Sequence, residues 1–409
     1  MSRVEKVDVR VLGSAQETSA CAPTSLVAPL LEKLRGGRLR VFLPNGSGIA
    51  SASDNFGLQA TLVIERWRAL RRLALGGDVG FAEAYVDRDW TSPDLVALLR
   101  LAARNVDALR AATSGTAIIR FVNRLRHLTR GNTRRNSRRN IMAHYDLGNA
   151  FYALWLDRTM QYSSAVWTED TPDLEAAQNR KLDRVVEWLA LDGGESVLEI
   201  GCGWGALAMR LAETKDARVT AITLSPAQIE FARDRSAAAG LDRRIDFRLQ
   251  DYRDVRGSFD RIVSIEMIEA IGERHWPVYF RSLASSLRPG GRAVVQAITI
   301  GEAFFEHYRR NPEFIQKHIF PGGFLPTRSA MAAQAARAGL RVVASERFGE
   351  SYALTLAEWR RRFHASWPEA TALGFDERFR RLWDYYLAYC EAGFAEGTID
   401  VSLIAMEHA

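Results

Sequence analysis

The hydrophobic positions of this chain repeat in one pattern from about Asp183 to Ser345. Short apolar runs typical of buried strands alternate with longer stretches that have the periodicity of amphipathic helices. The predicted strands are Val197–Ile200, Val219–Thr223, Ile245–Leu249, Asp260–Ile265, Ala293–Ile298 and Val342–Ser345, and the main predicted helices are Ala206–Glu213, Pro226–Ala239, Trp276–Leu287 and Ser329–Ala338. This alternation predicts an α/β fold with a doubly wound parallel sheet and a ligand at the carboxyl ends of its strands. Val401–Ala405 is expected to add a closing edge strand.

The first part of the chain lacks this alternation. Residues 1–25 carry Ser, Thr, Ala and Pro without a firm period, which predicts a loose leader. Residues 26–110 are expected to form a small domain of mixed structure. Its amphipathic segments are Leu30–Val41, Gly57–Leu75 and the predicted helix Asp94–Ala103. The pair Gly76-Gly77 predicts a break in the chain between them.

An arginine-rich stretch, residues 111–143, separates the two regions. No acidic residue occurs between Ala111 and Tyr145, whereas eight arginines do: Arg120, Arg124, Arg126, Arg130, Arg134, Arg135, Arg138 and Arg139. Apolar residues in its first half predict a basic amphipathic helix that continues into a linker. Three interpretations stay open: a solvated connector, adhesion to anionic phospholipid, and nucleic-acid binding, against which the scarcity of aromatic residues argues.

Composition narrows the function only a little. A chain of 409 residues and 45.8 kDa predicts about two or three domains. The net charge of +6 is a modest signal, because only five of the 55 basic residues are lysines. Cys21, Cys202 and Cys390 have no metal-ligand spacing, so we expect a reducing compartment, no disulfide framework and no metal. Without a secretory signal or a run of about 20 apolar residues, the chain is expected to be cytoplasmic or to lie on a membrane surface.

Three glycines follow the predicted strand Val197–Ile200 directly: Gly201, Gly203 and Gly205. Glycine permits a left-handed turn and lets a ligand approach the backbone. The G-x-G-x-G spacing is one residue shorter than the dinucleotide fingerprint, and the acidic Glu199 precedes the glycines instead of following them. A carboxylate there can pair with an ammonium group, which favours S-adenosylmethionine over a pyrophosphate. An ordinary strand-to-helix turn is the alternative.

Polar groups also follow the next two strands. The segment Thr223-Leu224-Ser225, with Gln228 about one helical turn beyond, can bring hydroxyl and amide groups to a ribose or a carboxylate, and Tyr252 offers an aromatic face to adenine. Each has an alternative interpretation as a turn or a helix cap. Their shared position at strand ends favours a ligand site.

Eight segments stand in a characteristic order: HYDLGN (His144–Asn149), MQYSSAVW (Met160–Trp167), VLEIGCGWG (Val197–Gly205), ITLSPAQ (Ile222–Gln228), QDYRD (Gln250–Asp254), FDRIVSIEMIEAIG (Phe259–Gly272), IFPGGFLP (Ile319–Pro326) and YYLAYCEAGF (Tyr385–Phe394). They resemble the cyclopropane-fatty-acid-phospholipid synthases and the related mycolic acid cyclopropane synthases, over about Asn140–Met406. Leu73–Trp90 is more weakly similar to the small N-terminal domain of the phospholipid-acting members. The resemblance implies a class I methyltransferase domain, residues 144–409, with a Rossmann-like doubly wound sheet.

The resemblance also implies an activity and a site. The activity is transfer of a methyl(ene) group from S-adenosylmethionine to the cis double bond of an unsaturated phospholipid acyl chain, giving a cyclopropane fatty acid at the inner membrane face. The implied cofactor contacts are Tyr162, Ser163, Glu199, Gly201, Gly203, Thr223, Leu224, Gln228, Tyr252 and Ile265. The implied catalytic residues are Glu269, Tyr352 and Cys390, and the implied bicarbonate site comprises Ser164, Glu269, Gln296, Ile298 and Tyr352.

This chemistry explains why such groups are needed. Methylation of a double bond leaves a positive charge on the acyl chain, which the aromatic faces of Tyr162, Trp167 and Tyr352 can stabilise. A base must then remove a proton, and Glu269 is the candidate for orienting that base, directly or through bicarbonate. Proton loss from the new methyl group closes a ring. Proton loss elsewhere gives a methyl-branched or methylene chain.

The chain departs from the family at three positions. Ser164 stands where the phospholipid-acting members have cysteine, and Gln296 and Ala270 stand where they have histidine. Gln296 cannot titrate near neutral pH, so the anion site is altered and the base is open. A product that stops at a methyl-branched or methylene chain is therefore an alternative. Cys390 also has an interpretation as a buried small hydrophobe, and Glu269 as a charge at a helix start.

Other functions remain possible from the sequence. Ala303-Phe304-Phe305, Phe314-Ile315 and Ile319-Phe320 form either an acyl-chain entrance or ordinary helix packing. The rival functions are a methyltransferase for a soluble small molecule or another macromolecule, and a lipid- or nucleic-acid-binding module without activity. The sequence does not report the oligomeric state, and a homodimer is compatible with it.

Overall fold

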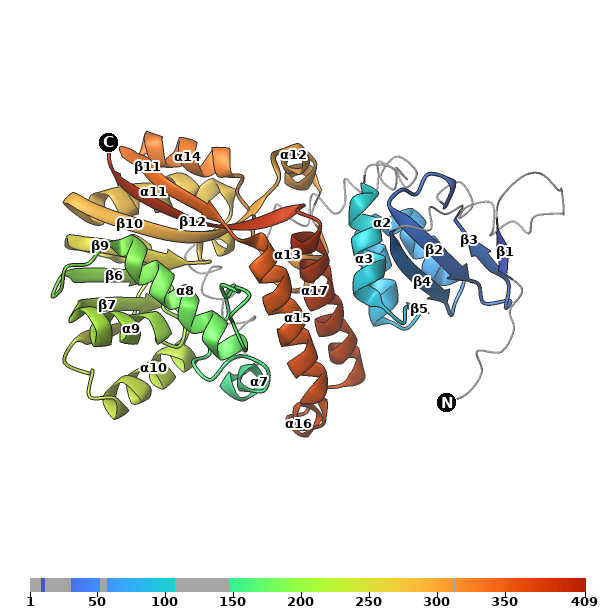
Figure 1. Ribbon diagram of the computed structural model, residues 1–409, viewed down its shortest axis with the longest axis horizontal. Coiled ribbons are helices and arrows are strands. Elements are labelled where there is room, and N and C mark those ends of the chain that lie inside the picture. Colours follow the sequence, from blue (N-terminus) through green and yellow to red (C-terminus); the bar gives the residue numbers. More distant parts are fainter. Residues whose placement is uncertain (1–8, 12–30, 52–56, 107–146, 312) are drawn as a thin grey trace. The chain divides into compact units, whose positions relative to one another are not determined.

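The computed structural model describes residues 9–11, 31–51, 57–106, 147–311 and 313–409 (Figure 1). The chain forms two compact units, one of Met1–Arg124 with Phe375–Glu396 and one of Leu125–Gly374 with Gly397–Ala409. The arginine-rich stretch 111–143 and most of the expected leader lie outside the described residues. What the sequence predicts for these two segments therefore stays a prediction.

The second unit contains a seven-stranded sheet with strand order β11-β12-β10-β9-β6-β7-β8. Its strands are β6 (Ser196–Ile200), β7 (Arg218–Thr223), β8 (Ile245–Leu249), β9 (Phe259–Ile265), β10 (Leu287–Ile300), β11 (Leu340–Arg347) and β12 (Ile399–His408). Strands β6 to β10 pair in parallel, whereas β12 is antiparallel to both of its neighbours. The predicted α/β fold with a doubly wound sheet is confirmed, with all six predicted strands within it.

The expected edge strand Val401–Ala405 is wrong in its position. Within β12, Ala405 pairs with Val294 of β10 on one side and with Ala344 of β11 on the other. The strand therefore lies inside the sheet, and β11 forms that edge. The physical reason is that all residues from Val401 to Met406 are buried, which is typical of a strand covered on both faces.

Two apolar layers cover the sheet, because successive strand residues point to opposite faces. Val197 and Val263 join a layer with helices α8 (Leu174–Leu189), α9 (Ala206–Lys215) and α10 (Pro226–Ala238). Their neighbours Leu198 and Ile262 join the other layer, with α11 (Trp276–Ser286) and α14 (Arg328–Arg337) (Figure 1). This arrangement leaves the carboxyl ends of the parallel strands available for a site.

The described part of this unit also contains further helices and turns. They are α7 (Asn149–Ala153), α12 (Glu302–Arg310), α13 (Phe314–His318), α15 (Gly349–Ala365), α16 (Trp367–Ala372) and the 3-10 turns η1 (Tyr252–Asp254), η2 (Ile268–Ala270) and η3 (Glu273–His275). Phe304 and Phe305 of α12 pack against the apolar layer of α11, and Phe314 and Ile319 are buried. The packing interpretation accounts for these side chains.

The first unit is built on a five-stranded sheet of order β1-β3-β2-β4-β5. The strands are β1 (Val9–Val11), β2 (Gly37–Phe42), β3 (Gly48–Ala50), β4 (Leu58–Ile64) and β5 (Trp90–Thr91), and the helices are α2 (Arg68–Val86), α3 (Leu95–Arg104) and α17 (Glu377–Ala395). Asp94 caps α3 by accepting a hydrogen bond of 2.9 Å from Ala97 N. Gly77, with φ 57° and ψ −138°, interrupts α2. The break predicted at Gly76-Gly77 is confirmed.

Helix α17 comes from the far end of the sequence yet belongs to this first unit. The Arg381 guanidinium donates hydrogen bonds to the carbonyl oxygens of Tyr85 (2.6 Å) and Trp90 (3.0 Å). The Tyr85 hydroxyl donates to Asp384 at 2.7 Å. Residues 375–396 of the predicted methyltransferase domain, 144–409, thus belong to the first unit, which was not predictable because contacts across about 300 positions leave no local pattern.

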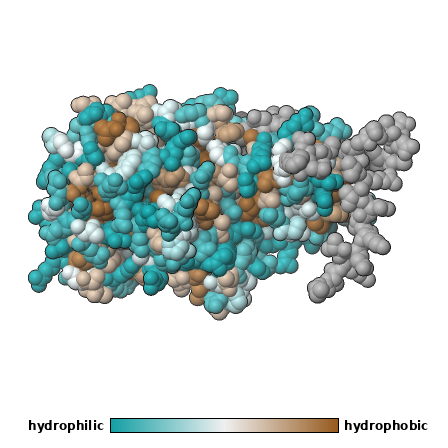
Figure 2. All heavy atoms as spheres, viewed as in Figure 1, coloured by the Kyte–Doolittle hydropathy of each residue, from teal (hydrophilic) through white to brown (hydrophobic). Residues whose placement is uncertain are grey.

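Hydrophobic residues are scattered in small groups among hydrophilic ones on the face shown in Figure 2. Among the described residues, the exposed large apolar side chains include Trp67, Leu75, Leu249, Val342, Leu354 and Leu373. None of the helices in the described part of the chain has the length and apolar character that crossing a membrane requires.

Candidate functional site

The glycine turn after β6 is shaped by three left-handed residues, with φ of 85° at Gly201, 52° at Gly203 and 84° at Gly205. A Cβ atom at Gly205 would lie 3.0 Å from Ala232 and Phe247, so this glycine is also needed for packing. A Cβ at Gly203 would find no atom within 4 Å. The turn therefore presents open backbone at Gly203, where a ligand can approach closely.

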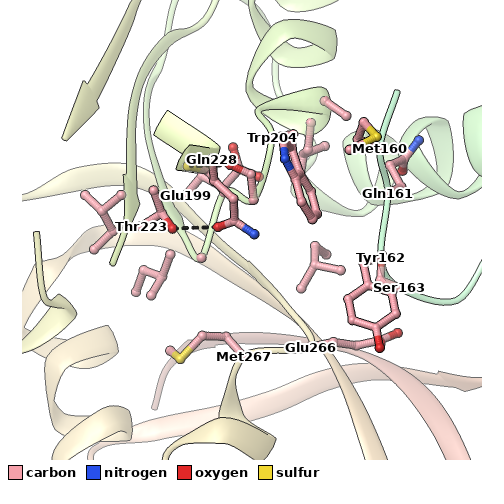
Figure 3. A pocket seen from close by; sticks show the side chains of 18 of the residues that line it. Met160, Gln161, Tyr162, Ser163, Glu199, Trp204, Thr223, Gln228, Glu266 and Met267 are labelled. Atoms are coloured by element: carbon pink, nitrogen blue, oxygen red, sulfur yellow. Dashed lines mark hydrogen bonds between the residues drawn. The ribbon is translucent and has the colours of Figure 1, made fainter. Parts of the chain in front are cut away.

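A pocket opens over this turn, at the carboxyl ends of β6, β7 and β9 (Figure 3). It is lined by all ten residues expected to contact the cofactor: Tyr162, Ser163, Glu199, Gly201, Gly203, Thr223, Leu224, Gln228, Tyr252 and Ile265. These residues come from four separate strand ends and from the loop before α8. The fold thus brings the predicted set together in one place.

Glu199 at the end of β6 is the acidic group of this pocket. Its side chain is buried, and its Oε2 atom has no hydrogen-bond partner among the described residues. Burial raises the pKa of this carboxyl to about 8. An unpaired buried acceptor that lines a pocket fits the ammonium group of a bound amino acid, so the residues present fit S-adenosylmethionine.

The ends of β7 and β8 supply neutral polar groups. The Thr223 hydroxyl donates a 2.9 Å hydrogen bond to Gln228 Oε1, which fixes the Gln228 amide (Figure 3). Ser225 caps α10 and sets the direction of that helix. The buried Tyr252 hydroxyl has no hydrogen-bond partner within the described ranges. These groups can orient a ribose and an adenine.

An aromatic cluster forms another wall of the pocket. The Tyr162 ring lies 5.3 Å from Tyr152, 5.5 Å from Trp155 and 5.4 Å from Trp359, measured between centroids. Trp204 also lines the pocket, and its indole N–H donates to Asn149 at 2.8 Å. Of the three aromatic residues expected to face a cation, Tyr162 lines the pocket. Trp167 instead donates to Thr355 at 3.0 Å and is not a lining residue.

Lys181 on α8 lines the pocket and is absent from the predicted site. Its ammonium group donates a 2.9 Å hydrogen bond to the Ser163 hydroxyl. Burial lowers its pKa to about 8, against the opposing effect of Glu266, Asp157 and Glu199. A sequence signal existed, because Lys181 is one of only five lysines and stands on the apolar face of a helix.

Glu266, directly after β9, was also missed and is the most connected acidic group of the site. Its Oε1 accepts hydrogen bonds from the Ser164 backbone N–H at 2.9 Å and from the Gln296 amide at 2.8 Å. Its Oε2 accepts from the Tyr352 hydroxyl at 2.7 Å. Burial raises the pKa of Glu266, and the three hydrogen bonds oppose that shift. The carboxylate lines the pocket with the predicted cofactor residues.

Glu269, the predicted orienting residue, lies on η2 and is not a lining residue of the pocket. Its Oε1 accepts a hydrogen bond from the Ile298 backbone N–H, and its Oε2 has no partner among the described residues. Burial first, and the nearby Glu266 second, raise the pKa of Glu269 to about 8. The group therefore holds its proton at neutral pH.

The expected bicarbonate site is thus occupied by the protein itself. Ser164, Gln296 and Tyr352 all donate to Glu266, and Ile298 donates to Glu269. An anion placed among these donors would lie where the Glu266 carboxylate lies and beside a like charge. The residues present do not fit bicarbonate.

Cys390 is placed on α17, in the other unit, and is not among the lining residues. It forms no disulfide with Cys202. Across the described ranges no group of three His, Cys, Asp or Glu side chains is arranged to hold a metal ion. The catalytic role predicted for Cys390 stays a prediction.

The strand order, the glycine turn and the buried acidic residue at the end of β6 define an enzyme, a class I S-adenosylmethionine-dependent methyltransferase. The chain belongs to the family described as mycolic acid cyclopropane synthetase, whose model matches residues 132–404. The resemblance on which the sequence analysis relied is thereby confirmed.

Individual relatives agree with this assignment. The tuberculostearic acid methyltransferase UfaA1 of Mycobacterium tuberculosis is 41% identical over 379 residues, 89% of this chain and 86% of the relative. The cyclopropane-fatty-acyl-phospholipid synthase of Escherichia coli is 37% identical over 334 residues, 79% of this chain and 81% of the relative. The crystal structure of mycolic acid cyclopropane synthase CmaA1 complexed with SAH and CTAB superposes with a TM-score of 0.62, at 32% identity, over 66% of this chain and 97% of that one.

Proposed function

We propose that this enzyme transfers a methyl group from S-adenosylmethionine to the cis double bond of an unsaturated acyl chain in a membrane phospholipid. The observation that carries the proposal is one pocket in which the ten residues expected to contact the cofactor meet an aromatic wall and a carboxylate, Glu266. The two relatives named for a fatty-acyl phospholipid and for tuberculostearic acid support a lipid acyl chain as the substrate.

S-adenosylmethionine, when bound, supplies a methyl group on a positively charged sulfur. Glu199 would pair with the ammonium end of the cofactor, since its carboxyl is buried and one oxygen is unpaired. Gly203 leaves room for the cofactor against the backbone of the turn. Tyr252 and Gln228 would fix the nucleoside at the neighbouring strand ends. These contacts would hold the cofactor in one orientation against the rest of the pocket.

The aromatic wall suits the cation that methylation creates on the acyl chain. Tyr162 is held by Tyr152, Trp155 and Trp359, so its ring cannot turn freely away from the pocket. The negative face of an aromatic ring attracts a cation, and a dry apolar wall keeps water from adding to it. The wall therefore favours proton loss over hydration.

The product depends on which proton leaves. Loss from the new methyl group gives a cyclopropane fatty acid, which is the product we propose. A methyl-branched or methylene chain is the second candidate, favoured by the relative that is named a tuberculostearic acid methyltransferase. Because the substrate is a membrane lipid, we further propose that the enzyme works at the cytoplasmic membrane surface, to which the arginine-rich stretch 111–143 would adhere.

The proposal is tested with purified protein, S-adenosylmethionine labelled in its methyl group, and phospholipid vesicles. We expect label in phospholipids with monounsaturated chains and none in matched phospholipids with saturated chains. Mass spectrometry before and after hydrogenation then distinguishes a ring from a methylene group. Absence of label from both lipids, in protein that binds SAH, would contradict the proposal.

A further inference from the structure

The side chain of Glu266 takes the place that the family resemblance assigns to an external anion. Three hydrogen-bond donors from separate elements converge on its two oxygens: the Ser164 N–H before α8, the Gln296 amide on β10 and the Tyr352 hydroxyl on α15. Hydrogen bonds to a carboxylate from fixed donors hold it in one position and favour its ionised form. The site is therefore preorganised around a carboxylate that the chain itself supplies.

The backbone at Glu266 is a second, independent observation. Its φ angle is 49°, in the left-handed region that glycine adopts readily and a side chain adopts at a cost. Its N–H donates to the Gln296 carbonyl at 2.8 Å, so Gln296 holds both the backbone and the side chain of Glu266. A strained residue at a functional site indicates that its side chain is needed there.

We propose that the Glu266 carboxylate is the proton acceptor of the reaction and that this enzyme needs no bicarbonate. This proposal rests on the proposed function. The π electrons of the double bond form a bond to the methyl carbon as the methyl–sulfur bond breaks, with its electron pair left on sulfur. The neighbouring chain carbon becomes a cation. A C–H bond of the new methyl group then breaks, its electron pair closes the ring, and the proton passes to Glu266.

The same acceptor serves the methylene product. A hydride shift between the two former alkene carbons moves the cation to the methylated carbon, and loss of a methyl proton to Glu266 forms the exocyclic double bond. Both routes conserve electrons and need no oxidant or reductant. The proton on Glu266 returns to solvent after the product leaves.

The neighbouring groups distinguish Glu266 from the other candidate, Glu269. Glu266 lines the pocket, whereas Glu269 does not and is turned to the Ile298 backbone. Two carboxyl groups in one buried region seldom both ionise, and three donors stabilise the charge on Glu266. Lys181 adds a positive charge that also faces Glu266. The arrangement leaves Glu269 neutral and Glu266 available as the base.

Two variants test the proposal in buffer freed of carbon dioxide. Wild-type enzyme should be equally active with and without added bicarbonate. Glu266→Gln keeps the shape but cannot accept a proton, so kcat should fall about 100-fold or more, without rescue by bicarbonate. Glu266→Gly removes the carboxylate and leaves its donors facing the pocket, so its low activity should rise with added bicarbonate. Glu273→Gln on η3, outside the pocket, is the control and should keep full activity.

A readout that does not depend on turnover accompanies this assay. With SAH bound, ¹³C-labelled bicarbonate should show no line broadening with wild-type protein and clear broadening with Glu266→Gly. Bicarbonate binding to wild-type protein, a wild-type requirement for bicarbonate, or an active Glu266→Gln enzyme would each overturn the proposal. If neither the wild-type enzyme nor any variant transfers methyl groups to lipid, the proposed function fails, while the binding measurement still decides whether Glu266 excludes bicarbonate.

Discussion

Three buried carboxyl groups in this pocket region differ in their surroundings and therefore in their chemistry. Glu199 has an oxygen without a hydrogen-bond partner among the described residues, which can pair with a cation. Glu266 accepts three hydrogen bonds, whereas Glu269 accepts one from a backbone N–H. In the proposed mechanism, identical side chains thus serve as cofactor anchor, base and neutral acid. The environment of each residue, and not its type, determines its role.

The role of Glu199 predicts a loss of cofactor affinity in Glu199→Gln. The variant cannot offer a charge to the ammonium group, so we expect SAH to bind about 10- to 100-fold more weakly, or about 1.5 to 3 kcal/mol. In wild type the affinity should rise from pH 6 to pH 8, because the carboxyl must ionise and its pKa is about 8 without ligand. In the variant this pH dependence should be absent.

Calorimetry with SAH measures both effects. Glu195→Gln is the matched control, since Glu195 accepts hydrogen bonds from Asp192 N and Gly193 N outside the pocket, and its affinity should equal that of wild type. Equal affinity of Glu199→Gln and Glu195→Gln would remove Glu199 from the cofactor site.

The raised pKa values also predict how stability depends on pH. Glu199 and Glu269 ionise at about 8 in the folded protein, whereas an unfolded glutamate ionises near pH 4.3. Between these values the folded state holds protons that the unfolded chain releases, so raising the pH favours unfolding. We expect the Tm of ligand-free protein to fall from pH 5 to pH 8, and to fall less in Glu269→Gln.

Calorimetric scans at several pH values test this expectation, and an unchanged slope of Tm against pH in Glu269→Gln would contradict it.

Glutamine resembles the protonated acid, so Glu269→Gln should also form product much faster than Glu266→Gln. From the sequence alone, Glu269 is the candidate for the base-orienting role. An equally large loss of activity in the two variants would return that role to Glu269.

The turn between β6 and α9 shows how one element combines packing and ligand access. All three of its glycines have positive φ, but a Cβ would meet atoms at 3.0 Å at Gly205 and none within 4 Å at Gly203. The same substitution, glycine to alanine, should therefore have different consequences at the two positions, because the surrounding atoms are close at Gly205 and absent within 4 Å at Gly203. A substitution at Gly205 should mainly lower the stability of the fold, and one at Gly203 should mainly hinder cofactor binding.

We predict that Gly205→Ala lowers the free energy of unfolding by about 2 to 4 kcal/mol, from left-handed strain and overpacking together. Gly203→Ala should cost about 1 kcal/mol of stability and weaken SAH binding, because its methyl group enters the pocket. Gly46→Ala, at φ 81° in the turn between β2 and β3 with no atom within 4 Å, is the control for strain alone. Denaturant unfolding measures the stability of the three variants, and calorimetry measures their affinity for SAH. Unchanged SAH affinity in Gly203→Ala would refute close approach of the cofactor.

The elements that were predictable are those with a local pattern. Strands such as Val197–Ile200 and helices such as Pro226–Ala239 follow from apolar periodicity and from caps such as Ser225. The place of β12 was not predictable, because pairing order depends on contacts with β10 and β11 far away in the sequence. A buried run indicates two covered faces but does not name the neighbouring strands.

For the whole molecule, two connections across long sequence distances were beyond any local pattern. Helix α17 joins the first unit through Arg381 and Asp384, and the chain then returns to the second unit as β12. In the site, the ten pocket-lining residues expected to contact the cofactor were predictable because most stand near strand ends and all match a family. Glu266 was not, because its partners Gln296 and Tyr352 lie 30 and 86 positions away.

The most direct measurement of the central claim is the fatty-acid composition of a host that expresses this chain. Mass spectrometry should reveal acyl chains that are heavier than the host's monounsaturated chains by a single methylene and that increase as those chains decrease. Expression of Glu199→Gln or Glu266→Gln at the same level should give far less of this product. An unchanged composition with folded, SAH-binding wild-type protein would contradict the claim that this pocket methylates the double bond of a lipid.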